Sequence, residues 1–72
     1  MRIAERKSGA SIVLEVLENR LGADKASAFK EVVARHLDGR AASIVLDLSM
    51  VEFIDSSGLG AILSILAYAE GL

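Results

Sequence analysis

The residues with the clearest chemical potential lie in one short run, Asp55-Ser56-Ser57-Gly58-Leu59-Gly60. A carboxylate and two hydroxyls here precede an apolar stretch that predicts a helix, and the first backbone N–H groups of a helix have no partner within it. One interpretation is structural: Asp or Ser caps these groups and contributes about 1 kcal/mol. The other is functional. Glycine costs about 1 kcal/mol relative to alanine in a helix, so Gly58 and Gly60 indicate that close approach to this turn matters.

Other kinds of chemistry have little support in the sequence. A serine hydrolase needs a Gly-x-Ser-x-Gly turn and a histidine base, whereas neither serine of the run has that context and the only histidine, His36, fits a surface position near a helix end. Asp47, Glu52 and Asp55 match no calcium-loop spacing, and no glycine-rich nucleotide motif occurs. We therefore expect no catalytic residue, no metal and no cofactor.

Composition limits the partners. The chain has 72 residues, eight Lys and Arg against ten Asp and Glu, and no cysteine. This balance lacks the basic surface of a nucleic-acid-binding domain. The longest nearly uncharged stretch, residues 56–69, is shorter than the roughly 18 residues that cross a membrane, and the first residues lack the apolar region of a secretion signal. We expect a cytoplasmic protein without nucleic-acid or membrane partners.

The elements that must position the run begin with a hairpin. Residues 1–7 form a weak strand candidate, Ser8-Gly9-Ala10 reads as a turn, and the β-branched residues 11–17 form a strong strand. Residues 19–22 read as a connection. Asp24 is then expected to cap a helix over residues 25–37, whose apolar stripe is followed by Gly39. That stripe consists of Ala26, Phe29, Val33 and Leu37.

A second strand and a second helix complete the predicted order. The continuous run Ile44-Val45-Leu46 within residues 43–49 predicts a strand buried on both faces. Residues 50–55 lead into a helix over residues 57–70 that ends at Gly71. The sequence thus predicts one α/β domain over residues 1–72, of order β-β-α-β-α, with a mixed sheet and a right-handed crossover.

The second helix is apolar almost all round. At about 100° per residue, one face carries Leu59, Ile62, Leu63 and Leu66. A smaller, weakly polar stripe carries Ser57, Ala61, Ser64 and Tyr68. This stripe either binds a partner protein or faces further parts of the same domain, and the sequence leaves both interpretations open.

Residues 44–63 resemble the signature of anti-sigma-factor antagonists of the STAS domain family, with the pattern V-L-D-L-x-x-V-x-F-I-D-S-S-G-L-G. The resemblance covers nearly the whole chain. It implies a STAS-type fold and a protein that binds rather than catalyses. The connection Asn19-Arg20-Leu21-Gly22 departs from the family's G-R-L-D type, because Asn replaces Gly and Gly replaces Asp.

The resemblance also implies a regulatory switch. Such antagonists sequester a serine-kinase anti-sigma factor, the kinase inactivates them by phosphorylating the first serine of the motif, and a PP2C-type phosphatase restores them. The matching position here is Ser56. The partner-binding surface would then comprise Asp55, Ser56, Ser57, Gly58, Leu59, Gly60, Ala61, Ser64 and Tyr68. The alternative is a structural STAS module, as in stress-signalling scaffolds, lipid-transport complexes and transporter tails, in which the serine is not phosphorylated.

Complete domains of this family are longer, with further strand–helix units after the helix that carries the motif. The present chain reads as a partial domain, ending with its second helix. The strand over residues 43–49 would then have an exposed edge, which invites association. Either the chain is truncated or another copy covers this edge, and we expect self-association.

Overall fold

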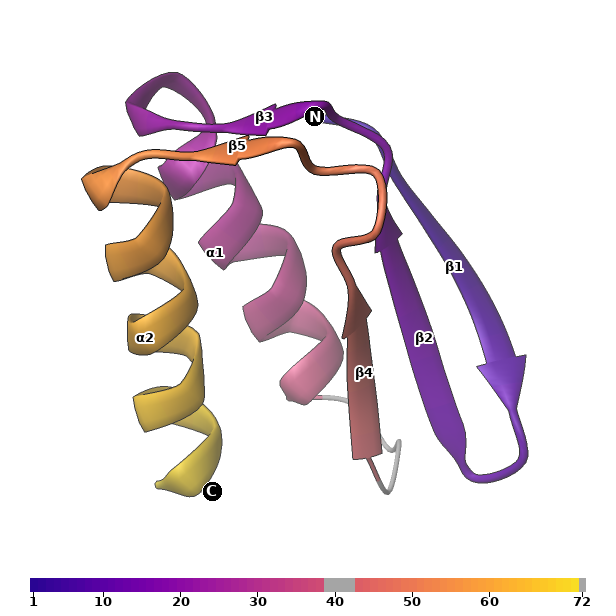
Figure 1. Cartoon of the computed structure of the whole chain (residues 1–72). Coiled ribbons are helices and arrows are strands. Elements are labelled where there is room, and N and C mark those ends of the chain that lie inside the picture. The colour runs from indigo at the N-terminus through magenta and orange to yellow at the C-terminus, as the bar shows by residue number, and fades with distance from the viewer. Residues whose placement is uncertain (39–42, 72) are drawn as a thin grey trace.

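The computed structural model describes residues 1–38 and 43–71, which form two sheets and a pair of helices (Figure 1). In chain order the elements are β1 (Ile3–Ser8), β2 (Ser11–Val16), β3 (Arg20–Leu21), α1 (Ala23–Leu37), β4 (Ser43–Asp47), β5 (Phe53–Ile54) and α2 (Ser56–Glu70). The predicted order of strands and helices is therefore confirmed, with two short additional strands.

The first two strands form the predicted hairpin. β1 pairs with β2 in antiparallel register, and Ser8 lies opposite Ser11 across the turn. Gly9 is the first of the two central residues of this turn, and its φ of 63° lies in the left-handed region. A two-residue turn of this kind matches the right-handed twist of the strands it joins. The position needs glycine because L side chains rarely adopt that conformation.

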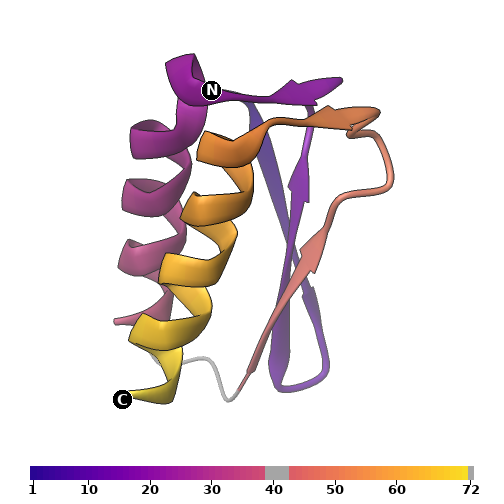
Figure 2. The same ribbon diagram turned by 60° about the vertical axis from the view of Figure 1, so that its left-hand side comes forward.

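The main sheet has the order β1-β2-β4, so β4 is an edge strand within the described residues. β4 runs parallel to β2, with Val45 opposite Val13, and α1 lies between the two strands in the chain. Both helices lie on the same side of this sheet (Figure 2). The expectation that β4 is buried on both faces is consequently wrong. Ile44 and Leu46 pack against the core, whereas Val45 is 48% exposed on the uncovered face.

A second, two-stranded parallel sheet was not predicted. Arg20 of β3 pairs with Phe53 of β5, and Leu21 pairs with Ile54. The carbonyl oxygen of Asn19 accepts hydrogen bonds from the backbone N–H groups of residues 52 and 53. The Arg20 guanidinium lies 5.1 Å from the centre of the Phe53 ring. This pairing brings the end of β5, and hence the start of α2, beside the start of α1 (Figure 1).

The core lies between the sheet and the helix pair. Its buried members are Leu14, Val16, Leu21, Phe29, Val33, Ala61 and Ile65. The predicted stripe of α1 is confirmed, with Phe29 and Val33 buried and Ala26 and Leu37 packed against the core. The predicted cap is wrong: α1 starts at Ala23, its N-cap residue is Gly22, and Asp24 lies inside the first turn. Gly39, the expected helix end, lies outside the described residues.

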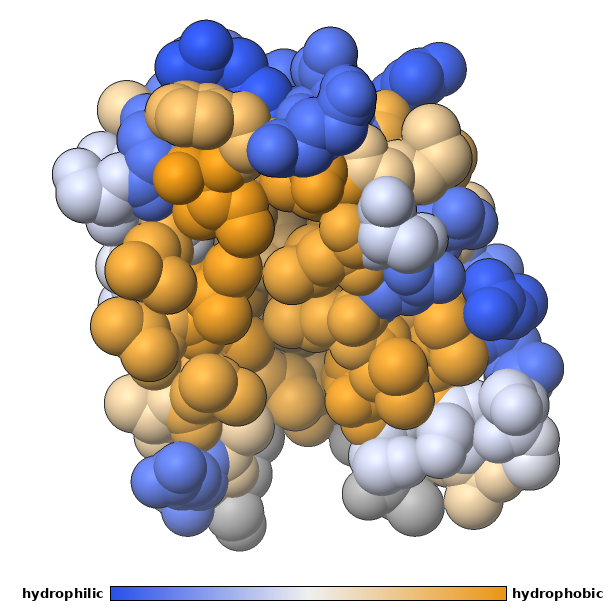
Figure 3. Space-filling view, in the orientation of Figure 1, coloured by the Kyte–Doolittle hydropathy of each residue, from blue (hydrophilic) through white to orange (hydrophobic). Residues whose placement is uncertain are grey.

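The second helix ends where the sequence predicts, with Gly71 as its C-cap residue. It leaves an apolar face open, because Leu59, Leu63 and Leu66 are each more than 50% exposed. In Figure 3 apolar side chains cover much of the surface formed by α2, β5 and β4. No helix of the described segments is long and apolar enough to cross a membrane.

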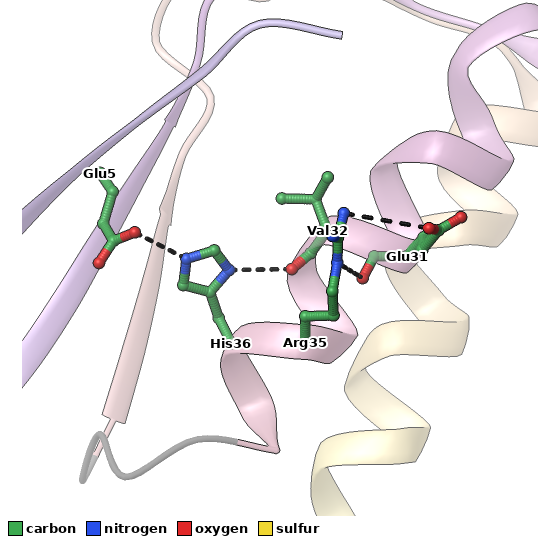
Figure 4. A network of polar contacts seen from close by, with 5 residues as sticks. All are labelled: Glu5, Glu31, Val32, Arg35 and His36. Atoms are coloured by element: carbon green, nitrogen blue, oxygen red, sulfur yellow. Dashed lines mark hydrogen bonds and ion pairs between the residues drawn. The ribbon is translucent and has the colours of Figure 1, made fainter.

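A small polar network joins the hairpin to α1 (Figure 4). The two ring nitrogens of His36 lie 2.9 Å from the carbonyl oxygen of Val32 and 2.9 Å from a carboxylate oxygen of Glu5 on β1. Both neighbours are hydrogen-bond acceptors, so both nitrogens donate only when the imidazole is protonated. These bonds, the one to Val32 first, raise the pKa of His36 above its usual value of 6.5, against a smaller effect of desolvation.

We expect this network to make stability depend on pH. Since the pKa of His36 is raised by folding, its contribution is complete below about 6.5 and is lost as the pH rises through the folded pKa. The loss should be less than about 1 kcal/mol because the pair is partly exposed. As the only histidine, His36 gives one NMR titration curve, and Glu5→Gln should lower its pKa. An unchanged pKa in that variant would contradict the contact.

Self-association through β4 remains a prediction. An unpaired edge beside an apolar face favours pairing with a second chain, whereas a lysine on an edge strand opposes it. Light scattering should therefore show a mass above 7.6 kDa that rises with concentration. The variant Val45→Lys should shift this mass toward that of the monomer. A single monomeric mass for the unmodified chain at all concentrations would contradict the prediction.

Candidate functional site

The motif begins at the N-terminus of α2, where Asp55 is the N-cap residue. Its backbone is extended, with φ −90° and ψ −178°, and its Oδ1 accepts a hydrogen bond of 2.9 Å from the backbone N–H of Gly58. The Asp55 backbone carbonyl accepts a further bond from the N–H of Leu59, at 2.9 Å. The structural interpretation of this residue as a helix cap is therefore correct.

The same carboxylate also contacts the other helix. Asp55 Oδ2 accepts a hydrogen bond of 3.2 Å from the backbone N–H of Ala23, the first residue of α1 and 32 positions away in sequence. The bond from Gly58, and more weakly those from Ala23 and Ser57, lower the pKa of Asp55 against the opposing effect of desolvation. A single ionised side chain thus satisfies donors at the N-termini of both helices.

Gly22 makes room for this arrangement. It is the N-cap residue of α1 but provides no side-chain bond to the helix. A Cβ atom at this position would lie 2.9 Å from Asp55 Oδ2. The family pattern has Asp at the position of Gly22. In this chain the absence of a side chain at Gly22 leaves space, and the carboxylate of Asp55 occupies that space. Local sequence patterns carry no signal for this partnership, because it depends on the pairing of β3 with β5.

The two glycines of the motif differ in their surroundings. A Cβ atom on Gly58 would overlap the backbone carbonyl of Leu21, whereas a Cβ atom on Gly60 would meet nothing within 4 Å. The backbone N–H of Asp55 donates to the same Leu21 carbonyl at 3.3 Å. Close approach therefore explains Gly58, and the approaching group is the backbone of β3. No group of the described residues approaches Gly60, so for this glycine the expectation of a close approach remains a prediction about a partner.

Both serines of the motif lie on the surface. Ser56 and Ser57 are the first residues of α2, and both are exposed. Asp55, directly before them, is half-buried between the two helices. A group attached to Ser56 would therefore extend into solvent from the N-terminal end of α2, one residue after the Asp55 cap. No group of three or more His, Asp or Glu residues in the described parts of the chain is placed to hold a metal ion.

The remaining residues of the expected partner surface divide into two groups. Leu59, Gly60 and Ser64 are exposed. Ala61 is only 3% exposed and belongs to the core, because α2 packs along α1 on this side. The inclusion of Ala61 in a partner-binding surface is therefore corrected. Tyr68 is 43% exposed, but its hydroxyl donates a 2.5 Å bond to Asp38 at the end of α1.

This arrangement matches a known family over almost its whole length. The family model described as "Mlab, STAS domain" matches residues 3–72. The chain belongs to the STAS domain family. None of the curated protein sequences matches this STAS domain at a significant level.

Two solved structures share the fold of this STAS domain. One, from Thermotoga maritima, is described as a putative anti-sigma factor antagonist; it is 31% identical, has a TM-score of 0.79, and covers 96% of this chain. The other is the anti-sigma factor antagonist SpoIIAA in its unphosphorylated form, 18% identical with a TM-score of 0.71 over 97% of this chain. This chain spans 59% and 64% of their respective lengths.

The contrast between the two glycines predicts opposite effects of the same substitution. Gly58→Ala should destabilise the domain by about 1–3 kcal/mol, as overpacking against a fixed backbone does. Gly60→Ala should instead stabilise it by up to about 1 kcal/mol, because alanine is the better helix former and the space is open. Urea unfolding followed by circular dichroism measures both. Equal effects of the two substitutions would contradict the contact of Gly58 with β3.

Proposed function

We propose that this STAS domain is an anti-sigma-factor antagonist, a protein-binding switch that sequesters a serine-kinase anti-sigma factor and is inactivated when that kinase phosphorylates Ser56. A PP2C-type phosphatase would restore it. It would act in the cytoplasm, without catalytic residues of its own. The observation that carries the proposal is the exposed Ser56 at the start of α2, directly after an ordered Asp55.

Several features support Ser56 as the acceptor. Ser56 is exposed, which a kinase requires, and Asp55 directly before it is fixed by bonds from Gly58 and Leu59. The motif is continuous from Asp55 to Gly60, as in the family signature. The 31% identical solved structure is itself described as a putative anti-sigma factor antagonist.

The physical effect of phosphorylation would be local. A phosphate adds about −1.5 to −2 charges, and a helix N-terminus favours negative charge, so the fold should remain intact. The same phosphate would stand beside the Asp55 carboxylate on the surface that contacts the partner. Its bulk, its hydration and its charge would then oppose docking.

The partner surface follows from the exposed residues around Ser56. We propose that the anti-sigma factor contacts Asp55, Ser56, Ser57 and the exposed side of α2 that carries Leu59, Gly60 and Ser64. Gly58 is not itself on this surface; its lack of a side chain lets the start of α2 pack against the backbone of β3. Tyr68 would contribute its ring edge while its hydroxyl remains bonded to Asp38.

A second candidate function is a structural STAS module whose serine is not phosphorylated. The matching family model is described only as "Mlab, STAS domain", a description that fits this candidate as well as the first. In such a module the Asp-Ser-Ser-Gly turn would serve only to position α2. The two candidates differ in whether Ser56 accepts phosphate.

Phosphorylation and binding can be measured directly. The chain is incubated with ATP and each serine-kinase anti-sigma factor encoded in the same genome, and the product is analysed by mass spectrometry. We expect one phosphate on Ser56, no label in Ser56→Ala, and a phosphate still located on Ser56 in the matched control Ser57→Ala. Ser56→Asp should weaken binding at least about tenfold, which corresponds to about 1.4 kcal/mol, and should keep its thermal transition.

Each other outcome has a distinct meaning. Absence of label with every kinase would favour the structural module. Label on Ser57 alone would show that the phosphate acceptor is Ser57 and not Ser56. If Ser56→Asp lost its circular-dichroism signal together with binding, phosphorylation would act by unfolding the domain, and the surface mechanism would be wrong.

A further inference from the structure

The contacts of Asp55 connect the phosphate-acceptor position to a distant part of the chain. One carboxylate oxygen binds the N–H of Gly58 in the first turn of α2, and the other binds the N–H of Ala23, the first residue of α1. Ser56 directly follows Asp55 and is exposed. Any charge placed on Ser56 therefore arises on the residue next to Asp55, whose side chain bonds to both helix starts.

We propose that Asp55 is a positioning residue that transmits the charge state of Ser56 to the N-terminus of α1. This link rests on the proposed function, which makes Ser56 the site of a reversible charge. The first turn of α1 would thereby become part of the regulated surface. In the unmodified state both helix starts are held together through Asp55, and in the phosphorylated state the contact with Ala23 is released.

The N-terminus of α1 depends on this contact because it lacks a cap of its own. Gly22 provides no side-chain acceptor. The first turn has two other supports, a bond of 3.0 Å from the Lys25 N–H to the Gly22 carbonyl and an ion pair of 3.0 Å between Lys25 and Glu18. Both involve Lys25, and neither provides an acceptor for the Ala23 N–H, which binds Asp55. Loss of the Asp55 bond therefore leaves this donor to water.

Two effects of a phosphate on Ser56 act against the bond to Ala23. The phosphate oxygens compete for the N–H donors at the start of α2, the same donors that now fix one oxygen of Asp55. The like charges of the phosphate and the carboxylate also repel each other. Once Oδ1 is displaced from Gly58, the carboxylate is no longer held in the orientation that presents Oδ2 to Ala23.

The remainder of α1 should be insulated from this change. Its other end is fixed by the bond between Asp38 and Tyr68 and by the contact of His36 with Glu5. Its middle is held by the buried side chains of Phe29 and Val33. The effect should therefore be confined to the first turn.

The chemistry of asparagine provides a sharp test. Asparagine is as good an N-cap residue as aspartate, but its side chain has one acceptor oxygen where aspartate has two. Asp55→Asn should therefore keep one of the two bonds and lose the other. If Asp55 only capped α2, this substitution would change neither the amide of Ala23 nor that of Gly58.

The experiment measures amide hydrogen exchange by NMR in the unmodified chain and in Ser56→Asp, Asp55→Asn and the matched control Ser64→Asp. Ser64→Asp places the same charge on an exposed position further along α2. In Ser56→Asp the Ala23 amide should exchange about 2- to 10-fold faster, the factor expected from loss of one hydrogen bond. In Asp55→Asn one of the two amides, Ala23 or Gly58, should show the same change, and the amides of Phe29 and Val33 should not change in any variant.

The link would be overturned if the Ala23 amide were unaffected in Ser56→Asp, if neither amide responded in Asp55→Asn, or if Ser64→Asp had the same effect as Ser56→Asp. These hydrogen-exchange measurements require no kinase. A response of Ala23 without kinase labelling of Ser56 would refute the proposed function and keep the link. Labelling of Ser56 without a response of the Ala23 amide would support the proposed function and refute the link.

Discussion

The close approach of the two helix N-termini is the constraint on which the rest of this small domain depends. Backbone N–H groups at helix starts carry partial positive charge, so two such ends side by side repel each other unless an anion lies between them. The ionised carboxylate of Asp55 is that anion, bonded to Gly58 on one side and to Ala23 on the other. Glycine at positions 22 and 58 provides the space, because a Cβ atom on Gly22 would collide with the Asp55 carboxylate and one on Gly58 with the Leu21 carbonyl of β3.

The helix pair has a polar contact at each end and an apolar contact between them. At the far end the hydroxyl of Tyr68 on α2 donates to Asp38, which follows α1. Between the two ends, the small side chain of Ala61 lets α2 approach the core formed by Phe29 and Val33. A site at one end of such a pair can therefore change its charge without disturbing the packing that defines the fold. This separation is what a reversible surface modification requires.

The sequence predicted those elements whose signal is local. The hairpin, the stripe of α1, the strand at β4 and the end of α2 at Gly71 each follow from periodicity or from a turn residue within a few positions. The sheet formed by β3 and β5 was missed, because each strand has two residues and forms only through pairing across the chain. The cap of α1 was assigned to Asp24 for the same reason, since local patterns cannot reveal a carboxylate that arrives from 32 residues away.

The candidate site was partly predictable on similar grounds. A capping Asp and a helix start at the motif can be inferred from residue types, whereas the reason for Gly58 required the position of the Leu21 carbonyl. The stripe on α2 shows where helical projection fails: it groups Ala61 with Ser64, yet the structure buries the first and exposes the second. Projection gives the angles between side chains but not the direction of the neighbouring helix. Here that direction is set by the junction at Asp55, which fixes where α2 begins relative to α1 and so decides which of its residues remain on the surface.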